Sequence, residues 1–178
     1  MIKRVKEKIC EVKDFPKPGI GFKDITPMIE DAECFHYVVE KLAEWVKERN
    51  AEIVAGIESR GLIFAAPIAH KLGLGLTIIR KKGKLPRETV TVKAPNEYSL
   101  EYFEMHRDSI QPKQKVVIID DLIATGSSTV SAIDLVKTLG GEVAGFAVVV
   151  ELSFLKGLDF IKNKHPEVDV FSLIQFKE

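Results

Sequence analysis

Residues 115–128 read KVVIIDDLIATGSS, and this stretch decides the fold class. It opens with a continuous apolar run at 116–119, which is typical of a strand covered on both faces. Two acidic residues follow, then a loop of small and hydroxyl residues. A helical apolar face begins at Val130. Strand, small-residue loop and helix in this order indicate an α/β sheet.

Strands and helices alternate on both sides of this stretch. Further strands are predicted at 53–57, 76–79, 143–150 and 168–174, and helices at 35–46, 62–72, 130–139 and 154–161. Asp31 is predicted to cap the first helix, and Gly73 to end the second. We therefore predict an α/β fold with a mostly parallel twisted sheet flanked by helices. The length of 178 residues predicts one domain over 1–178.

Two segments depart from the parallel pattern. Residues 15–22 contain two prolines and two glycines, which forbid a regular helix, yet Phe15 and Phe22 are too apolar for a solvated linker. We predict a small N-terminal hood over about residues 11–30. Residues 89–93 and 98–105 alternate at two-residue spacing, so we predict an antiparallel flap over about residues 82–110.

Charge and cysteine content exclude several classes of protein. Lys and Arg total 26 and Asp and Glu total 26, and this balance argues against a nucleic-acid coat protein. Cys10 and Cys34 are too few for a disulfide framework and lack metal-ligand spacing. No apolar run approaches the roughly 18 residues of a transmembrane helix, and no secretory signal is evident. We expect a cytoplasmic protein that binds neither membrane nor nucleic acid.

The residues that follow the central run predict a sugar-phosphate site. The small and hydroxyl residues of the loop are Ala124, Thr125, Gly126, Ser127 and Ser128. A helix N-terminus presents unpaired N–H groups that hold phosphate, and Gly126 lets the backbone approach the anion. Asp120 and Asp121 can accept hydrogen bonds from a sugar diol or approach a divalent metal. The alternative is an acidic turn with an ordinary helix cap.

This stretch resembles the phosphoribosyl-diphosphate motif of the type I phosphoribosyltransferases. Further segments, in order, resemble the adenine phosphoribosyltransferase branch of that family over about residues 11–174. They are FPKPGIGFKDITP at 15–27, ESRG at 58–61, IRKKGKLP at 79–86 and ELSFLKG at 151–157. The resemblance implies a purine-salvage reaction in which adenine and phosphoribosyl diphosphate give AMP and pyrophosphate. It also implies Mg²⁺ as the cofactor.

The resemblance implies roles for individual residues. Asp120 and Asp121 would hold the ribose hydroxyls, and any direct metal contact would fall to them, while the backbone of 124–128 would cradle the 5′-phosphate. Ser59 and Arg60 would meet the pyrophosphate, with Arg60 among the catalytic groups. The adenine-binding residues would be Gly21, Phe22 and Lys23, with the Phe22 ring stacked on the base.

A basic stretch suits a polyanionic substrate. Five cations lie between positions 80 and 87, and charge-assisted hydrogen bonds favour pyrophosphate. Arg80, Lys81 and Lys84 are assigned to the substrate. In similar enzymes part of this stretch reaches the partner subunit's site, which implies a homodimer. Taken alone, the stretch is also consistent with a solvated cationic loop or a nucleic-acid patch.

The family carries a Glu-Tyr pair that assists proton transfer at the purine, and this sequence contains two such pairs. Counting across the flap without gaps places the pair on Glu97, the predicted catalytic carboxylate, and Tyr98, a predicted substrate contact. Glu101 is the second candidate for the carboxylate. Ser127 stands where relatives usually carry glycine, and we expect phosphate binding with slightly altered loop geometry.

Two other functions remain open at this point. A phosphoribosyltransferase for another purine base would share the phosphate loop and differ in the hood. A non-catalytic sensor of phosphoribosyl diphosphate would carry an added DNA-binding domain. We expect the dozen residues before the hood to be too few for such a domain.

Overall fold

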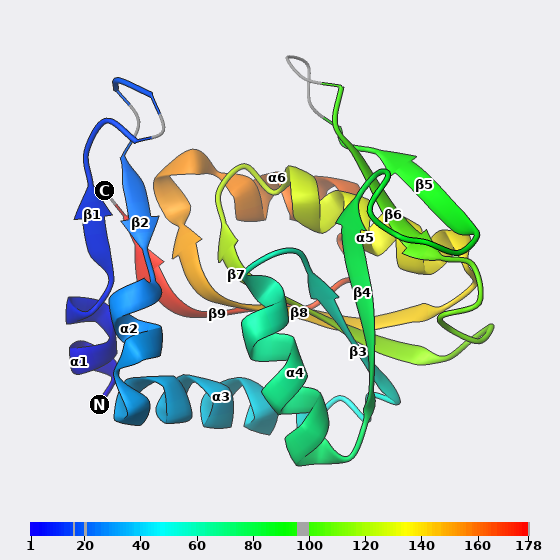
Figure 1. Cartoon of the computed structure of the whole chain (residues 1–178), viewed down its shortest axis with the longest axis horizontal. Coiled ribbons are helices and arrows are strands. Elements are labelled where there is room, and N and C mark those ends of the chain that lie inside the picture. The colour runs from blue at the N-terminus through cyan, green and yellow to red at the C-terminus, as the bar shows by residue number, and fades with distance from the viewer. Residues whose placement is uncertain (16, 20, 96–99, 178) are drawn as a thin grey trace. The chain divides into compact units, whose positions relative to one another are not determined.

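The computed structural model describes residues 1–15, 17–19, 21–95 and 100–177 (Figure 1). The chain forms two compact units, Met1–Lys41 and Leu42–Glu178. The first unit contains helix α1 (Ile2–Glu7), strands β1 (Cys10–Val12) and β2 (Phe22–Asp24), helix α2 (Thr26–Glu30) and the first part of α3 (Ala32–Lys47). β1 and β2 pair antiparallel, so the predicted hood segment contains a strand pair followed by a helix.

Asp31 caps the N-terminus of α3, as predicted from the sequence. Its Oδ1 accepts the backbone N–H of Cys34 at 3.1 Å, which satisfies one unpaired donor of the first helical turn. Its Oδ2 lies 2.8 Å from Nη2 of Arg4 and 3.3 Å from Nζ of Lys8. The hydrogen bond from Arg4, followed by that from Cys34, holds the pKa of Asp31 well below its usual range. This carboxylate joins the end of α1 to the start of α3.

The Leu42–Glu178 unit is built on a seven-stranded sheet with the order β5-β6-β4-β3-β7-β8-β9. The parallel strands are β3 (Ile53–Ile57), β4 (Gly75–Lys81), β7 (Lys115–Ile123), β8 (Glu142–Leu152) and β9 (Val170–Phe176). β5 (Thr89–Lys93) and β6 (Tyr102–His106) form the antiparallel edge. The predicted α/β class and the antiparallel pairing within the flap are confirmed.

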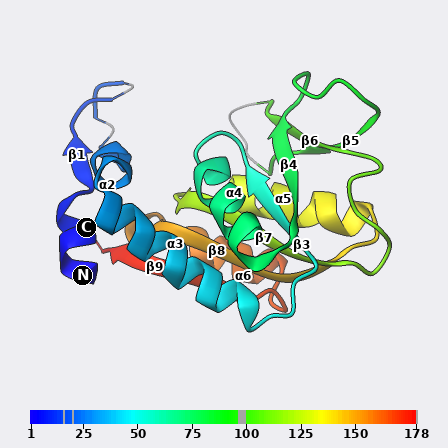
Figure 2. The same cartoon turned by 60° about the horizontal axis from the view of Figure 1, so that its bottom comes forward.

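Helices cover both faces of this sheet (Figures 1 and 2). They are α4 (Gly61–Leu72), α5 (Ser127–Thr138), α6 (Gly157–Lys164) and the end of α3, whose Trp45 stacks on Phe171 of β9. A Cβ added at Gly56 of β3 would lie 2.8 Å from Cβ of Ala65, so α4 packs closely on one face. Ala55 and Ile57 belong to the cluster that contains Val130 of α5, on the other face. Burial on both faces explains why these strands read as continuous apolar runs.

Among the boundaries that differ from the sequence prediction, two lie next to the acidic pair and the loop that follows it. β7 continues to Ile123, because its residues beyond Ile119 pair with β8, and Asp120 and Asp121 therefore lie within the strand. The helix predicted at 154–161 is divided. A 3₁₀ turn at Ser153–Leu155 is followed by Lys156 with φ of 55°, and α6 starts only at Gly157.

Among the helices formed by the described residues, none is both long enough and apolar enough to cross a bilayer.

Candidate active site

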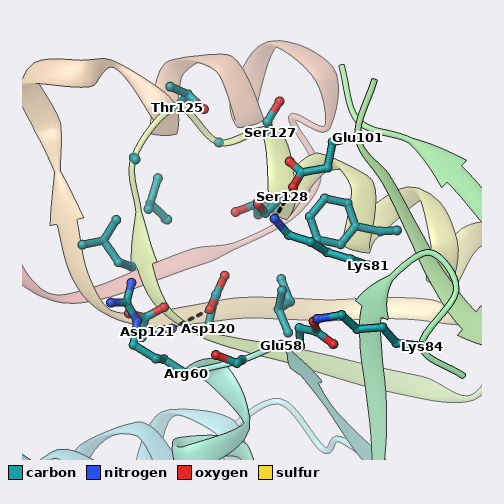
Figure 3. A pocket seen from close by; sticks show the side chains of 18 residues that line it. Glu58, Arg60, Lys81, Lys84, Glu101, Asp120, Asp121, Thr125, Ser127 and Ser128 are labelled. Carbon is teal, nitrogen blue, oxygen red and sulfur yellow. Dashed lines mark hydrogen bonds and ion pairs between the residues drawn. The ribbon is translucent and has the colours of Figure 1, made fainter. Parts of the chain in front are cut away.

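A pocket of about 590 Å³ lies in the Leu42–Glu178 unit where β3, β4 and β7 end (Figure 3). This is the edge of an open α/β sheet where ligands are expected. Its lining includes the predicted residues Ser59, Arg60, Lys81, Lys84, Asp120, Asp121, Ala124, Thr125, Gly126, Ser127 and Ser128. The fold therefore brings together segments that are far apart in the sequence.

The acidic pair forms the floor of the site and is almost entirely buried. The backbone N–H of Asp121 donates to Oδ1 of Asp120 at 2.8 Å, and Oδ2 of Asp121 lies 2.7 Å from Nε of Arg60. Burial, followed by the negative charge of Asp121, raises the pKa of Asp120 well above its usual range. Arg60 thus balances one carboxylate, while the other favours its neutral form. A neutral carboxyl can both donate and accept hydrogen bonds, which suits a sugar diol.

Gly61 allows this arrangement. A Cβ at this position would lie 2.8 Å from Oδ1 of Asp120 and 2.9 Å from the carbonyl oxygen of Ile119. Only glycine lets the start of α4 approach β7 so closely. The approach places Arg60, the residue before α4, next to Asp121.

The loop between β7 and α5 has the form expected of an anion site. Gly126 precedes α5 with φ of +83°, a conformation that favours glycine. The first residues of α5 are Ser127, Ser128 and Thr129, so hydroxyls and the helix N-terminus face the same pocket. This geometry suits an anion, and its assignment to the 5′-phosphate stays a prediction.

Gly157 packs against this loop from α6, and its role was missed in the sequence analysis. A Cβ at Gly157 would lie 2.8 Å from Cγ2 of Ile123 and 3.0 Å from the carbonyl carbon of Ala124. A Cβ at Gly126 would in turn lie 2.6 Å from the carbonyl oxygen of Gly157. The phosphate loop and the start of α6 therefore fit together only because two glycines face each other.

Glu58 holds the cationic side chains and was also missed as a site residue. It directly follows β3, its side chain is 6% exposed, and it pairs with Arg80 through Oε2 and with Lys84 through Oε1. Burial alone would raise the pKa of Glu58. The bonds from Lys84 and Arg80 lower it by more, so the pKa lies below its ordinary value. The available signal was an acidic residue immediately after a buried strand.

Glu104 fixes the turn that carries Lys84. Its buried carboxylate accepts the backbone N–H groups of Lys84 and Leu85 through Oε1, each at 2.9 Å. Burial raises the pKa of Glu104, and the backbone hydrogen bonds of the turn lower it below the ordinary value. The carboxylate of Glu104, which belongs to the flap, thus fixes the backbone of the turn after β4.

The flap contributes Glu101 to the pocket. Oε1 of Glu101 lies 2.5 Å from Nζ of Lys81, and both side chains line the cavity with Phe103. Glu101 was the second candidate for the catalytic carboxylate. The first candidate, Glu97, and its neighbour Tyr98 lie outside the described residues, so the choice between the two glutamates stays a prediction.

The predicted adenine-binding residues belong to the Met1–Lys41 unit. Phe22 meets Phe15 edge to face, with ring centroids 5.2 Å apart. Nζ of Lys23 lies 3.0 Å from Oε2 of Glu11, and Lys23 lowers the pKa of that glutamate. Gly21 directly precedes β2, and a Cβ there would lie 3.2 Å from Oε1 of Glu11.

The acidic pair fits a metal that is shared with a substrate. Over the described ranges, no group of three or more His, Cys, Asp or Glu side chains could hold a metal ion. Mg²⁺ is usually bound by one or two carboxylates together with waters and substrate phosphates. Asp120 and Asp121 match that mode as two adjacent carboxylates that line the pocket, and Oδ2 of Asp121 is already paired with Nε of Arg60.

Comparison with known proteins agrees with this geometry. A family model described as the phosphoribosyl transferase domain matches residues 26–177, which defines the class. A curated adenine phosphoribosyltransferase from Caldicellulosiruptor bescii is 50% identical over 173 residues, covering 97% of each chain. The chain belongs to the adenine phosphoribosyltransferase family, the purine-salvage enzymes that convert adenine and phosphoribosyl diphosphate to AMP and pyrophosphate.

Solved structures share the fold over the whole length. The crystal structure of adenine phosphoribosyltransferase from Thermoanaerobacter pseudethanolicus is 42% identical, with a TM-score of 0.92, and the match covers 99% of this chain and 100% of that chain. The enzyme from Saccharomyces cerevisiae is 33% identical, with a TM-score of 0.87, and the match covers 97% of this chain and 98% of that chain.

Proposed function

We propose that the pocket binds phosphoribosyl diphosphate and that its residues direct the phosphoribosyl group to adenine. One observation supports the proposal. A buried acidic pair, a helix N-terminus preceded by a glycine, and a group of cations meet at one cavity. A sugar diol, a monophosphate and a pyrophosphate match these three parts in turn. The structure of the Saccharomyces cerevisiae relative is titled as a complex with an imino-altritol bisphosphate and adenine, which supports such a ligand set.

In this proposal each part of the substrate has its own contacts. The N–H groups of residues 124–128, with the hydroxyls of Thr125 and Ser128, hold the 5′-phosphate. Asp120 and Asp121 accept hydrogen bonds from the ribose hydroxyls. The pyrophosphate meets Ser59, Arg60, Arg80, Lys81 and Lys84. These cations stabilise the negative charge that develops on the leaving group.

The reaction then needs one bond formed and one broken. N9 of adenine bonds to C1′ of the ribose, and the C1′–oxygen bond breaks, with the electron pair leaving on the pyrophosphate. The N9 proton passes to a flap carboxylate, which we assign to Glu97, with Glu101 as the alternative and Tyr98 beside the substrate. Mg²⁺, held by the diphosphate with Asp120 or Asp121, would neutralise charge on the leaving group.

We assign the adenine contacts to the hood. The Phe22 ring offers a flat apolar face for stacking on a base, and the backbone of Gly21 and Lys23 offers polar groups for its edge. The enzyme from Giardia lamblia, 29% identical, is titled as a complex with 9-deazaadenine. A different purine base would need a different edge pattern from the same backbone, and this is the second candidate for the substrate.

The active form is proposed to be a cytoplasmic homodimer that binds neither nucleic acid nor membrane. Two large apolar side chains support the dimer: Ile63 of α4 is 39% exposed and Leu76 of β4 is 41% exposed. An interface would bury the apolar surface that these two side chains expose.

Substitution of Asp121 by asparagine tests the assignment. The change keeps the shape of the side chain but removes the charge that faces Arg60, so we expect kcat to fall about 100-fold while the melting temperature changes little. Asp169→Asn is the matched control, because Asp169 pairs with Arg49 on the surface. AMP formation from adenine and phosphoribosyl diphosphate is measured with Mg²⁺ present. Wild-type turnover in the Asp121 variant would refute the assigned role.

A further inference from the structure

Ser127 connects the phosphate loop to the flap. Its Oγ donates a hydrogen bond to the carbonyl oxygen of Pro95 at 3.1 Å. Ser127 is the first residue of α5, and Pro95 lies two positions beyond the end of β5. The two residues are 32 positions apart in the sequence, so the bond joins separate parts of the Leu42–Glu178 unit.

The bond acts where the flap reaches the pocket. The backbone N–H of Ala94, next to Pro95, donates to the carbonyl oxygen of Glu101 at 2.8 Å and extends the ladder between β5 and β6. The side chain of Glu101 then enters the cavity and pairs with Lys81 (Figure 3). Holding Pro95 therefore also holds the backbone position from which Glu101 projects.

The hydroxyl of Ser127 has one proton to donate. In the structure that proton goes to the carbonyl oxygen of Pro95. The backbone N–H of Ser127 lies at the start of α5, where a helix binds anions. Thr125 and Ser128 supply other hydroxyls to the same pocket. The backbone and the side chain of Ser127 can therefore serve two different partners.

We propose that Ser127 is a positioning residue, whose hydroxyl fastens the flap to the phosphate loop and so keeps Glu101 in the pocket. The kinetic part of this inference rests on the proposed function, since it takes residues 124–128 to bind the 5′-phosphate and Lys81, the partner of Glu101, to meet the pyrophosphate. A residue without a side-chain hydroxyl at this position could not make this bond.

Three single substitutions separate a tether from a phosphate contact. Ser127→Ala removes the tether and keeps a good helix former at the start of α5. Ser128→Ala removes a hydroxyl assigned to phosphate. Thr138→Ala is the control, because its Oγ1 bonds to the carbonyl of Asp134 at the other end of α5. Amide hydrogen exchange at Ala94, followed by NMR without ligand, reports on the flap.

We expect exchange at Ala94 to rise about 2- to 12-fold in Ser127→Ala, which is the range for loss of one neutral hydrogen bond. Exchange in Ser128→Ala and Thr138→Ala should equal that of the wild type. In steady-state assays, Ser127→Ala should lower kcat more than it raises KM for phosphoribosyl diphosphate. Ser128→Ala should mainly raise that KM.

Either of two results would overturn the inference. One is wild-type exchange at Ala94 in the Ser127 variant. The other is a raised KM with unchanged kcat in that variant, which would make the hydroxyl a phosphate contact. If the wild-type protein formed no AMP, the proposed function would fail, whereas exchange at Ala94 in the ligand-free protein would still decide whether the tether exists.

Discussion

Substitution of Gly157 by alanine is a sharp test of how the phosphate loop is shaped, because Gly157 lies behind the loop on α6. The added Cβ would lie 2.8 Å from Cγ2 of Ile123 and 3.0 Å from the carbonyl carbon of Ala124, and closer still to the carbonyl oxygen of Ala124. Ordinary carbon contacts are about 3.5 to 4.0 Å. The loop or the helix must therefore shift by roughly 1 Å, because two of these partners are backbone atoms.

A shift of this size falls on the proposed 5′-phosphate site. Displacements of about 1 Å cost up to about 100-fold in catalysis when they misplace a substrate. We expect kcat/KM for phosphoribosyl diphosphate to fall between 10- and 100-fold, mainly through KM. Overpacking of this kind typically costs about 1 to 3 kcal/mol of stability, so the variant should still fold.

The assay is AMP formation at varied phosphoribosyl diphosphate, with circular dichroism to confirm the fold. Gly75→Ala is the matched control, since a Cβ there would lie 3.6 Å from its nearest neighbour, Cγ1 of Ile53. The control should keep wild-type kinetics. If the folded Gly157 variant also kept the wild-type KM, the loop would not depend on the packing of α6, and the reasoning would be refuted.

Two buried acids give further predictions. The raised pKa of Asp120 means that folding favours the neutral form of its carboxyl group. The neutral carboxyl stabilises the folded state fully below about pH 3.9, and this stabilisation is lost as the pH rises. Asp120→Asn should therefore melt at or above the wild-type temperature at pH 8, with a smaller difference near pH 5, while turnover falls. A lower melting temperature at pH 8 would contradict this. The lowered pKa of Glu58 has the opposite effect on the pH dependence of stability. The ionised carboxylate stabilises the folded state above about pH 4.3, and this stabilisation is lost as the pH falls. Glu58→Gln should lose most stability near neutral pH in urea unfolding and raise KM for phosphoribosyl diphosphate roughly tenfold. A stability deficit that grew in acid would argue against the pairing.

The sequence predicted the sheet well because its strands are buried on both faces. Residues 116–119 read as one apolar run, and the structure places helices on each side of them. Asp31 caps the start of one helix, and Gly73 ends another. Both act on backbone groups only a few residues away in the sequence, so neither role needs a tertiary contact. Such features depend on short stretches and can be read directly.

The parts of the site that were missed depend on distant contacts. Glu58 matters because Arg80 and Lys84 fold back onto it, and Gly157 matters because the loop at Ala124 rests against it. The bond from Ser127 to Pro95 likewise joins residues that no local pattern connects. Spacing along the chain indicates residue types for a site, but pairing across the fold decides which of them touch.

The most direct test of the central claim is steady-state formation of nucleoside monophosphate from phosphoribosyl diphosphate and Mg²⁺, with adenine, hypoxanthine or guanine as the base. We expect AMP and one equivalent of pyrophosphate with adenine, and far lower kcat/KM with the other two bases. Preference for hypoxanthine or guanine would contradict the assigned base. Absence of product with all three, in a folded protein that binds phosphoribosyl diphosphate, would contradict catalysis at this pocket.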